Sequence, residues 1–232
     1  MKRRLISGLF DSAMDKAMVG DVIYYKSGKL SFFSKDNIDQ LLKPYAIAIV
    51  IGRLPHRLLI LSIERGEKIV YSPTYVLVPG VTVATWDSSW NPNTQVDDLS
   101  GKANTDALVD YYGLSTSYAA GYCKSYNVAN IDWYLGGFGE MKYVYNNLSV
   151  IDSVRSALGY KPLFHKIGEE VYTCLWSSTQ TQNPERALGL RRPGGGSGYD
   201  PECQDFRKYV GWIDYGWGIF GSIVYPMSSI KI

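Results

Sequence analysis

Few side chains in this chain of 232 residues have the types and spacing that chemistry requires. Three cysteines, Cys123, Cys174 and Cys203, are widely separated, with no Cys-x-x-Cys pair and no Cys/His cluster. This spacing does not supply the grouped ligands of a zinc site, and an odd number cannot complete a disulfide framework. A single disulfide bridge is an alternative, but reduced thiols are favoured. His56 and His165 lack the context of a Ser–His–Asp or Cys–His nucleophile.

The acidic side chains do not suggest hydrolysis either. Asp97-Asp98 and Glu169-Glu170 are adjacent pairs, and neighbouring side chains point in different directions. Glycoside hydrolysis needs two carboxyl groups that face each other across a cleft. We therefore predict that the protein is not an enzyme, that it binds no metal and that it needs no cofactor.

Aromatic side chains are the more informative group. They make up 14% of the chain, and all six tryptophans and 14 of the 19 tyrosines follow residue 85. Flat rings offer rigid contact area to sugars and protein epitopes at low entropic cost. The candidate ligand-binding residues are Tyr209, Trp212, Tyr215, Trp217, Arg191 and Arg192. Core packing is the alternative for Trp212, because it alternates with Val210 and Ile213.

The overall composition limits the class of protein to which these residues can belong. With 46% hydrophobic and 20% charged residues the chain can bury a core, and its net charge of +2 does not favour nucleic-acid binding. No apolar run reaches the length of a membrane helix, so we expect no membrane insertion. Residues 1–80 carry 12 basic and 7 acidic side chains, whereas the remainder carries 12 and 15. The shift in charge and aromatic content predicts a domain boundary near residue 80.

The first 18 residues are predicted to be an N-terminal arm. Apolar residues recur there every four positions, which indicates a short helix or a docking segment. Met1–Phe10 begins like a signal peptide, but the apolar stretch stops at Asp11 and is too short for export. We therefore expect the protein to be made and folded in a cytoplasm.

Residues 19–80 are predicted to form a β-rich attachment or oligomerisation module. Its β-branched and aliphatic runs are separated by glycine and proline, as strands of a small antiparallel sheet should be. The expected strands are 22–25, 29–33, 45–51, 58–63, 69–71 and 75–78. Residues 81–104 read as a connecting loop whose tryptophans, Trp86 and Trp90, would dock on the following domain.

Residues 105–232 are predicted to mix helices and strands. Asn104-Thr105 is expected to cap a first helix, and apolar periodicity predicts three more helices over 117–126, 139–148 and 150–158. Gly159 is a natural residue to end the last of them. The expected strands are 170–177, 209–214 and 219–227.

Four segments carry a more specific pattern. They are Asp98-Leu99-Ser100-Gly101-Lys102-Ala103-Asn104-Thr105, Ala119-Ala120-Gly121-Tyr122-Cys123-Lys124-Ser125-Tyr126, Trp133-Tyr134-Leu135 with Glu140, and Leu175-Trp176-Ser177-Ser178-Thr179. Over residues 95–232 this pattern resembles the Lcl-type (DUF1566) domains, with their W-x-L-P-x-x-x-E-L and W-S-S-T motifs. It is also similar to phage fibre and tropism-determinant proteins with a C-type-lectin-like fold.

The N-terminal module carries a second resemblance. Gly20-Asp21-Val22-Ile23-Tyr24-Tyr25 followed by Ala46-Ile47-Ala48-Ile49-Val50-Ile51-Gly52 resembles a "GDI-x-Y … P-x-G-V-V-V" module. That module precedes lectin-like domains in virion proteins of tailed phages of gut bacteria, including crAss-like phages. The resemblance implies an α+β fold, with a small N-terminal antiparallel β module and a C-terminal C-type-lectin-like domain.

The resemblance assigns scaffold roles to the shared residues. It implies that Trp133 anchors a strand leading into helix 139–148, that Trp176 anchors the central sheet, and that the hydroxyls of Ser177 and Ser178 bond loop backbone. In such folds the loops after the W-S-S-T strand determine ligand specificity, and here these loops are residues 180–220. Gly136 replaces the proline of the motif, and the paired acidic and amide ligands of calcium-dependent lectins are missing, so calcium-dependent sugar binding is not expected.

The function implied by the resemblance is a bacteriophage virion surface protein, either a head fibre, a capsid decoration protein or a tail-fibre component. It would be made in the host cytoplasm, bind other virion proteins and a host-surface glycan or protein, and form a dimer or trimer. A bacterial surface adhesin is an alternative that requires export. A relative of formylglycine-generating enzymes is a second alternative, but Cys203 lies 29 residues from Cys174, without the reactive pair that such chemistry needs.

Overall fold

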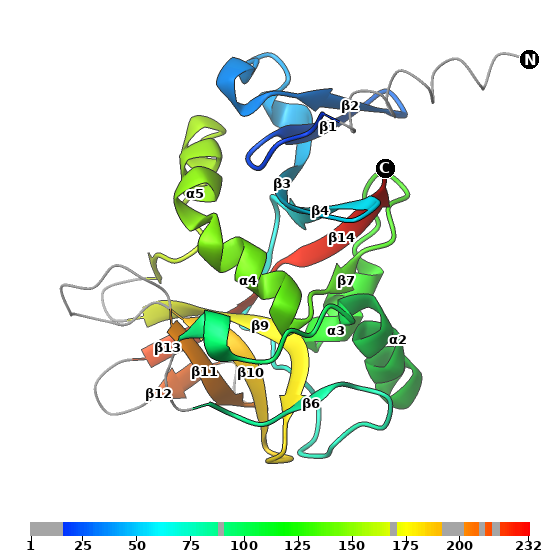
Figure 1. The fold of residues 1–232 in the computed structure, drawn as a ribbon, viewed down its shortest axis with the longest axis vertical. Coiled ribbons are helices and arrows are strands. Elements are labelled where there is room, and N and C mark those ends of the chain that lie inside the picture. Colours follow the sequence, from blue (N-terminus) through cyan, green and yellow to red (C-terminus); the bar gives the residue numbers. More distant parts are fainter. Residues whose placement is uncertain (1–15, 88–90, 168–170, 192–201, 209–211, 215–218) are drawn as a thin grey trace, which may run out of the picture.

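The computed structural model describes residues 16–87, 91–167, 171–191, 202–208, 212–214 and 219–232. It is a mixed α+β protein built on two sheets in which most strand pairs are antiparallel (Figure 1). The coarse α+β class expected from the sequence is therefore confirmed.

The first sheet has six strands in the order β2-β1-β3-β4-β14-β7, all antiparallel. The strands are β1 (Val22–Lys26), β2 (Lys29–Phe33), β3 (Ala46–Leu54), β4 (Arg57–Ser62), β7 (Tyr134–Leu135) and β14 (Pro226–Lys231). The first four confirm predicted strands. Ser27 and Gly28 join β1 to β2 with φ angles of 52° and 76°, as a tight two-residue hairpin turn requires.

Strand pairing crosses the boundary that the sequence suggests near residue 80. β14, from the C-terminal part, pairs with β4 from Met227 opposite Leu61 to Lys231 opposite Arg57. Without β14, the apolar strand β4 would expose a row of backbone groups at the sheet edge. The two predicted parts of the chain therefore share one sheet.

The second sheet runs in the order β11-β10-β9-β13-β12, with three short strands added to it. Its strands are β5 (Gly66–Glu67), β6 (Val83–Ala84), β8 (Lys166–Ile167), β9 (Val171–Thr181), β10 (Arg186–Arg191), β11 (Glu202–Arg207), β12 (Trp212–Asp214) and β13 (Ile219–Val224). β9 lies at its centre, antiparallel to β10 and parallel to β13. This arrangement confirms the predicted strand over 170–177.

Two predicted strands, 69–71 and 75–78, do not form. Their segment contributes one isolated bridge, between Val70 and Tyr118, and otherwise runs as irregular chain. Side chains hold it instead of a ladder: Gln180 exchanges two hydrogen bonds with the Val78 backbone, at 3.1 and 3.2 Å. Periodicity cannot distinguish a strand from an extended segment whose partners are side chains.

The helices are α2 (Gly101–Tyr112), α3 (Ala119–Ser125), α4 (Phe138–Asn146) and α5 (Leu148–Ala157). All four predicted helices are present, and α5 ends as expected at Gly159, whose φ is 79°. The bond from Tyr160 N–H to Arg155 C=O, at 2.8 Å, closes this end. The predicted cap at Asn104-Thr105 is wrong, because α2 already begins at Gly101 and Asn104 and Thr105 are buried within its first turns.

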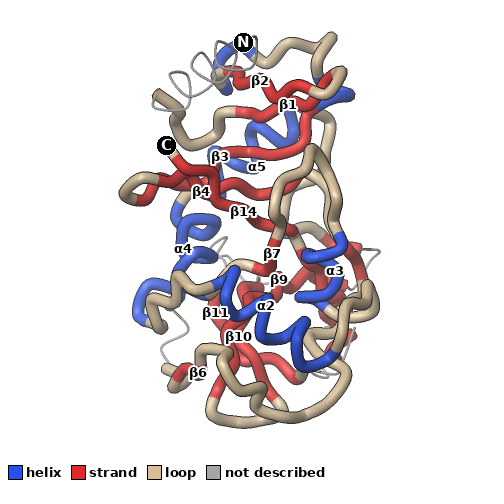
Figure 2. The backbone as a smooth tube through the Cα atoms, turned by 90° about the vertical axis from the view of Figure 1, so that its right-hand side faces the viewer, coloured by secondary structure: helices blue, strands red, loops and turns tan. Residues whose placement is uncertain are grey.

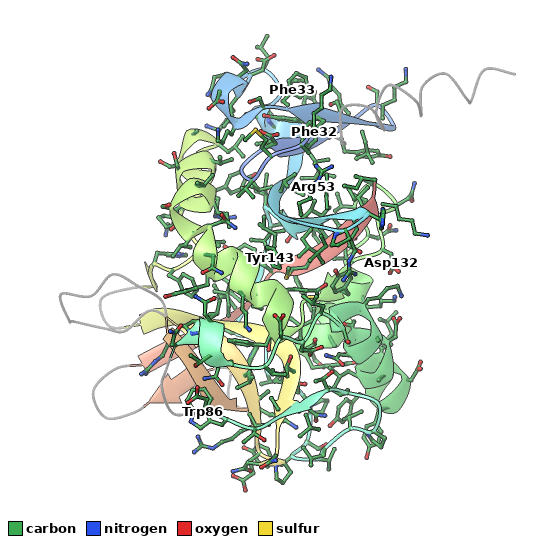
Figure 3. The ribbon with its side chains drawn as sticks, viewed as in Figure 1. Phe32, Phe33, Arg53, Trp86, Asp132 and Tyr143 are labelled. Carbon is green, nitrogen blue, oxygen red and sulfur yellow. The ribbon has the colours of Figure 1, made fainter. Side chains whose placement is uncertain are left out.

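The largest core cluster lies between the first sheet, helices α4 and α5, and the second sheet (Figure 2). Tyr143 of α4 packs over Gly52 of β3, where any Cβ would collide with its ring (Figure 3). Trp133 and Trp176 are each 1% exposed, which confirms them as core residues. Trp86 packs against the largest cluster, to which both parts of the chain contribute, whereas Trp90 lies outside the described residues.

Candidate functional site

Three of the four motif segments, near residues 98–105, 133–140 and 175–179, meet at one buried polar network at the start of α2. Asp98, which is 5% exposed, lies at its centre. Its carboxylate accepts hydrogen bonds from Asn104 Nδ2 at 2.7 Å, Thr179 Oγ1 at 2.6 Å and Ser100 N–H at 2.9 Å. Thr82 Oγ1 lies 3.2 Å from the same carboxylate. One side chain thus joins α2, β9 and the segment before α2.

Asn104 and Thr105 extend the network to β7. Asn104 Oδ1 accepts the Thr82 N–H at 2.9 Å, and its Nδ2 also donates to Ser178 Oγ at 3.1 Å. Thr105 Oγ1 accepts the Leu135 N–H at 2.9 Å and donates to Gly101 C=O at 2.8 Å. Helix α2 is therefore fixed to β7 and β9 by side chains that the sequence suggests as a helix cap.

Glu140 is the second buried carboxyl group of this region, with no exposed surface. It accepts the Gly137 N–H and the Tyr134 hydroxyl, each at 2.9 Å. Burial raises the pKa of Glu140 to about 7, although both hydrogen bonds oppose this rise. The carboxyl group therefore changes charge near neutral pH while completely enclosed.

The W-S-S-T segment lies in the centre of β9. Trp176 Nε1 donates to Ile69 C=O at 3.0 Å, and Thr179 Oγ1 accepts the Phe138 N–H at 2.9 Å. The expectation that the serine hydroxyls bond loop backbone is wrong: Ser177 Oγ donates to Leu188 C=O in β10, and Ser178 Oγ accepts from Asn104. The reason is that β9 is a central strand, so its hydroxyls meet neighbouring elements instead of loops.

These contacts give the network the character of a scaffold. Its polar groups are buried and bonded to each other, and they join α2, β7 and β9. Within the part of the chain that the structure describes, no group of three His, Cys, Asp or Glu side chains is placed to hold a metal ion. Cys123 and Cys174 are both buried, and burial raises the pKa of the Cys123 thiol well above its usual range.

Close packing around Gly101 provides a test of this scaffold. A Cβ on Gly101 would collide with the Glu140 carboxyl group and the Gly137 backbone nitrogen. We expect Gly101→Ala to destabilise the protein by about 1–3 kcal/mol, the usual cost of overpacking, although alanine is the better helix former. Urea unfolding followed by circular dichroism measures this change. An unchanged or increased stability would contradict the observed packing.

The structure describes only part of the predicted binding group. Arg191, at the end of β10, is 5% exposed and so is not presented to a ligand at the surface. Trp212 begins β12 and pairs with Gly221 of β13. Arg192, Tyr209, Tyr215 and Trp217 lie outside the described residues. The hypothesis of an aromatic binding cluster there stays a prediction.

A second aromatic region, which the sequence reasoning missed, is exposed in the described part of the chain. We call Tyr75, Leu77, Tyr111 and Leu114 the tyrosine surface; their exposed fractions are 44, 41, 54 and 62%. The Thr74 and Tyr112 hydroxyls lie 3.0 Å apart, and the rings of Tyr111 and Tyr112 are 4.9 Å apart. These contacts bring segment 74–77 beside the end of α2.

Lys208 holds the segment that carries part of the tyrosine surface. It is fully buried, and its Nζ donates to Val76 C=O at 2.7 Å and to Gln180 Oε1 at 2.8 Å. Its carbonyl accepts the Tyr71 N–H at 2.8 Å. Burial lowers the pKa of Lys208 to about 8.

One signal in the sequence points to the tyrosine surface. Residues 69–86 contain no charged side chain, in a protein in which one residue in five is charged. A long uncharged segment usually signals burial, and here part of it is exposed. Exposed tyrosine and leucine in such a segment are typical of a contact surface.

Comparison with known proteins identifies no relative. No family model, curated protein sequence or solved structure matches the chain. Among the described residues, no helix has both the length and the apolar character needed to span a membrane. The evidence about function therefore comes from the sequence motifs and from the surfaces that the fold creates.

Proposed function

We propose that this protein is a virion surface component of a tailed bacteriophage, in which a C-type-lectin-like domain over residues 105–232 contacts the host cell. The observation that carries the proposal is the buried network around Asp98. Segments 98–105 and 175–179 supply side chains to it, and Leu135 and Phe138 of the third segment donate backbone N–H groups to two of its threonines. This convergence is expected if the motifs shared with lectin-like phage proteins form one scaffold.

The tyrosine surface, to which that domain contributes Tyr111 and Leu114, supports adhesion as its role. Its rings and alkyl groups are exposed, while hydrogen bonds from Lys208 to Val76 and between Thr74 and Tyr112 fix the segment that carries them. Rigid tyrosines lose little entropy on binding, and they offer both an apolar face and a hydroxyl group. An uncharged glycan or a protein epitope on the host is the partner that this chemistry suits.

Within the N-terminal module, residues 19–80, strands β1 to β4 are proposed to attach the protein to the particle, whereas Tyr75 and Leu77 near its end belong to the tyrosine surface. In this arrangement β1 and β2 lie at one end of the molecule and the second sheet lies at the other (Figure 1). A fibre or decoration protein needs this separation between its anchored end and its host-facing end.

The proposed location on the virion surface is tested with purified particles of a phage that encodes this chain. We expect peptides of the chain in the mass spectrum of gradient-purified virions, and density for its two sheets on the surface of a cryo-EM map. Absence of the chain from intact virions would overturn the proposal. Recovery of a processed form on a bacterial surface would favour an exported adhesin instead.

Adhesion is tested with substitutions on the tyrosine surface. We expect Tyr75→Ala combined with Tyr111→Ala to weaken binding of the purified protein to host cells about 30-fold or more, as loss of interface tyrosines commonly does. Tyr45→Ala is the matched control, because Tyr45 is also a partly exposed tyrosine, 37% exposed, but its ring contacts Lys26 of β1 and is no part of the tyrosine surface. Cell binding is measured by flow cytometry with labelled protein. Equal binding by the double variant would remove this surface from the proposal.

A further inference from the structure

The free edge of the first sheet carries an inference about assembly. β2 is the terminal strand in the order β2-β1-β3-β4-β14-β7, and among the described residues it pairs only with β1. That pairing is regular over five positions, from Val22 opposite Phe33 to Lys26 opposite Lys29. β2 contains no proline and no bulge, which are common devices that stop an edge strand from pairing further.

The register shows which backbone groups are available at this edge. In a two-residue hairpin the closing pair, here Lys26 and Lys29, exchanges backbone hydrogen bonds, and such pairs alternate along the ladder. Lys29, Ser31 and Phe33 therefore direct their N–H and C=O groups toward β1. Leu30 and Phe32 direct theirs outward, where the described part of the chain offers them no backbone partner.

The side chains of β2 are apolar on both faces of the sheet. Leu30 and Phe32 pack partly against the core cluster on one face, and Phe33 packs against the largest cluster on the other. Phe33 also meets Tyr24 edge to face at 5.1 Å. All three remain half-buried, and Phe32 and Phe33 lie at the end of the molecule that β2 forms (Figure 3). The apolar layers on both faces of the first sheet therefore extend to its edge strand β2.

We propose that β2 pairs antiparallel with β2 of a second copy of this chain, around a two-fold axis at Ser31. Leu30 would then face the partner's Phe32, and the outward groups of these residues would form four backbone hydrogen bonds. The two Ser31 residues would form the central pair without hydrogen bonds, with Cα atoms about 4.5 Å apart. The result is one continuous twelve-stranded sheet across the dimer.

A second copy is the occupant that the edge itself favours. Leu30-Ser31-Phe32 has the order apolar, polar, apolar, which is the same in either chain direction. Two antiparallel copies therefore place apolar side chains opposite apolar side chains. The positive charge of Lys29 lies at the end of the strand, outside the central pairs. Leu41, 81% exposed, follows in the next segment and adds apolar surface near this end.

Disulfide trapping tests the axis directly. Under mild oxidation we expect Ser31→Cys to form a covalent dimer, because a Cα separation of about 4.5 Å suits a disulfide. Lys29→Cys is the matched control: in the proposed register each Lys29 faces the partner's Phe33, so two cysteines at position 29 are too far apart to join. Equal crosslinking by both variants would indicate random collision and overturn the register.

The proposed equilibrium between monomer and dimer is tested by analytical ultracentrifugation of the full chain over a range of concentrations. We expect a concentration-dependent dimer, and Phe32→Lys should raise its dissociation constant about tenfold or more by placing charge in the central pairs. Thermal melting checks that Phe32→Lys still folds. A wild-type protein that stays monomeric at high concentration, with no Ser31→Cys crosslink, would refute the proposal. Neither result depends on the proposed function.

Discussion

Replacement of Asp98 by alanine is expected to destabilise the protein by about 3–5 kcal/mol, because it removes the central acceptor of a buried hydrogen-bond network. The carboxylate accepts hydrogen bonds from Asn104, Thr179 and Ser100, at 2.6 to 2.9 Å. Alanine would leave these donors buried without an acceptor, and each unsatisfied donor costs about 1–3 kcal/mol. The effect should therefore exceed that of an ordinary surface substitution by a wide margin.

Asp97 provides the matched control for this experiment. It is the preceding residue and also an aspartate, but its side chain is 76% exposed and lies 3.4 Å from Lys142 Nζ. Exposed ion pairs contribute about 0–1 kcal/mol, so Asp97→Ala should change stability little. Urea unfolding monitored by tryptophan fluorescence measures both variants. Similar losses for Asp97→Ala and Asp98→Ala would show that the buried network does not stabilise the fold.

Stability is expected to fall as the pH rises from about 4.5 to about 7, because Glu140 must ionise inside the protein. The pKa of its carboxyl group is about 7 in the folded state and 4.5 without the surrounding structure. The folded state therefore binds the proton more tightly, and this contribution is complete below pH 4.5 and lost as the pH passes 7. A shift of this size corresponds to about 3 kcal/mol.

The Glu140→Gln variant isolates this contribution from other titrating groups. Glutamine cannot ionise, and its amide oxygen can still accept the Gly137 N–H that Glu140 accepts now. The difference in unfolding free energy between wild type and variant should change by about 3 kcal/mol between pH 4.5 and pH 8, in favour of the variant at high pH. Tyr134, Asp98 and Arg57 also act on Glu140, and all remain in the variant. A difference that is constant with pH would refute the raised pKa.

Local signals in the sequence predict local structure well. The hairpin of β1 and β2 follows from Ser27-Gly28 between two apolar runs, and α5 follows from its apolar face and Gly159. The tryptophans of the motifs are also correctly predicted as core, because large rings in a shared pattern favour a scaffold role. In each case the determining residues lie within a few positions of each other.

What could not be predicted depends on segments that meet only in the folded chain. Asn104 resembles a helix cap by type, yet its partners are Asp98, Thr82 and Ser178. β6 forms within the predicted loop 81–104, because Val83 and Ala84 pair with the end of β9. No pattern within either segment reports such distant contacts.

The pairing of β14 with β4 also determines when the protein can fold during synthesis. The ribosome makes β1, β2, β3 and β4 early, but the strand that covers β4 emerges after the whole second sheet. Until then Leu58, Leu59, Ile60 and Leu61 form an apolar strand with an open edge. Native contacts so distant in sequence slow folding. The nascent chain therefore carries an aggregation-prone strand through most of its translation, so a chaperone or fast assembly would protect it at this stage.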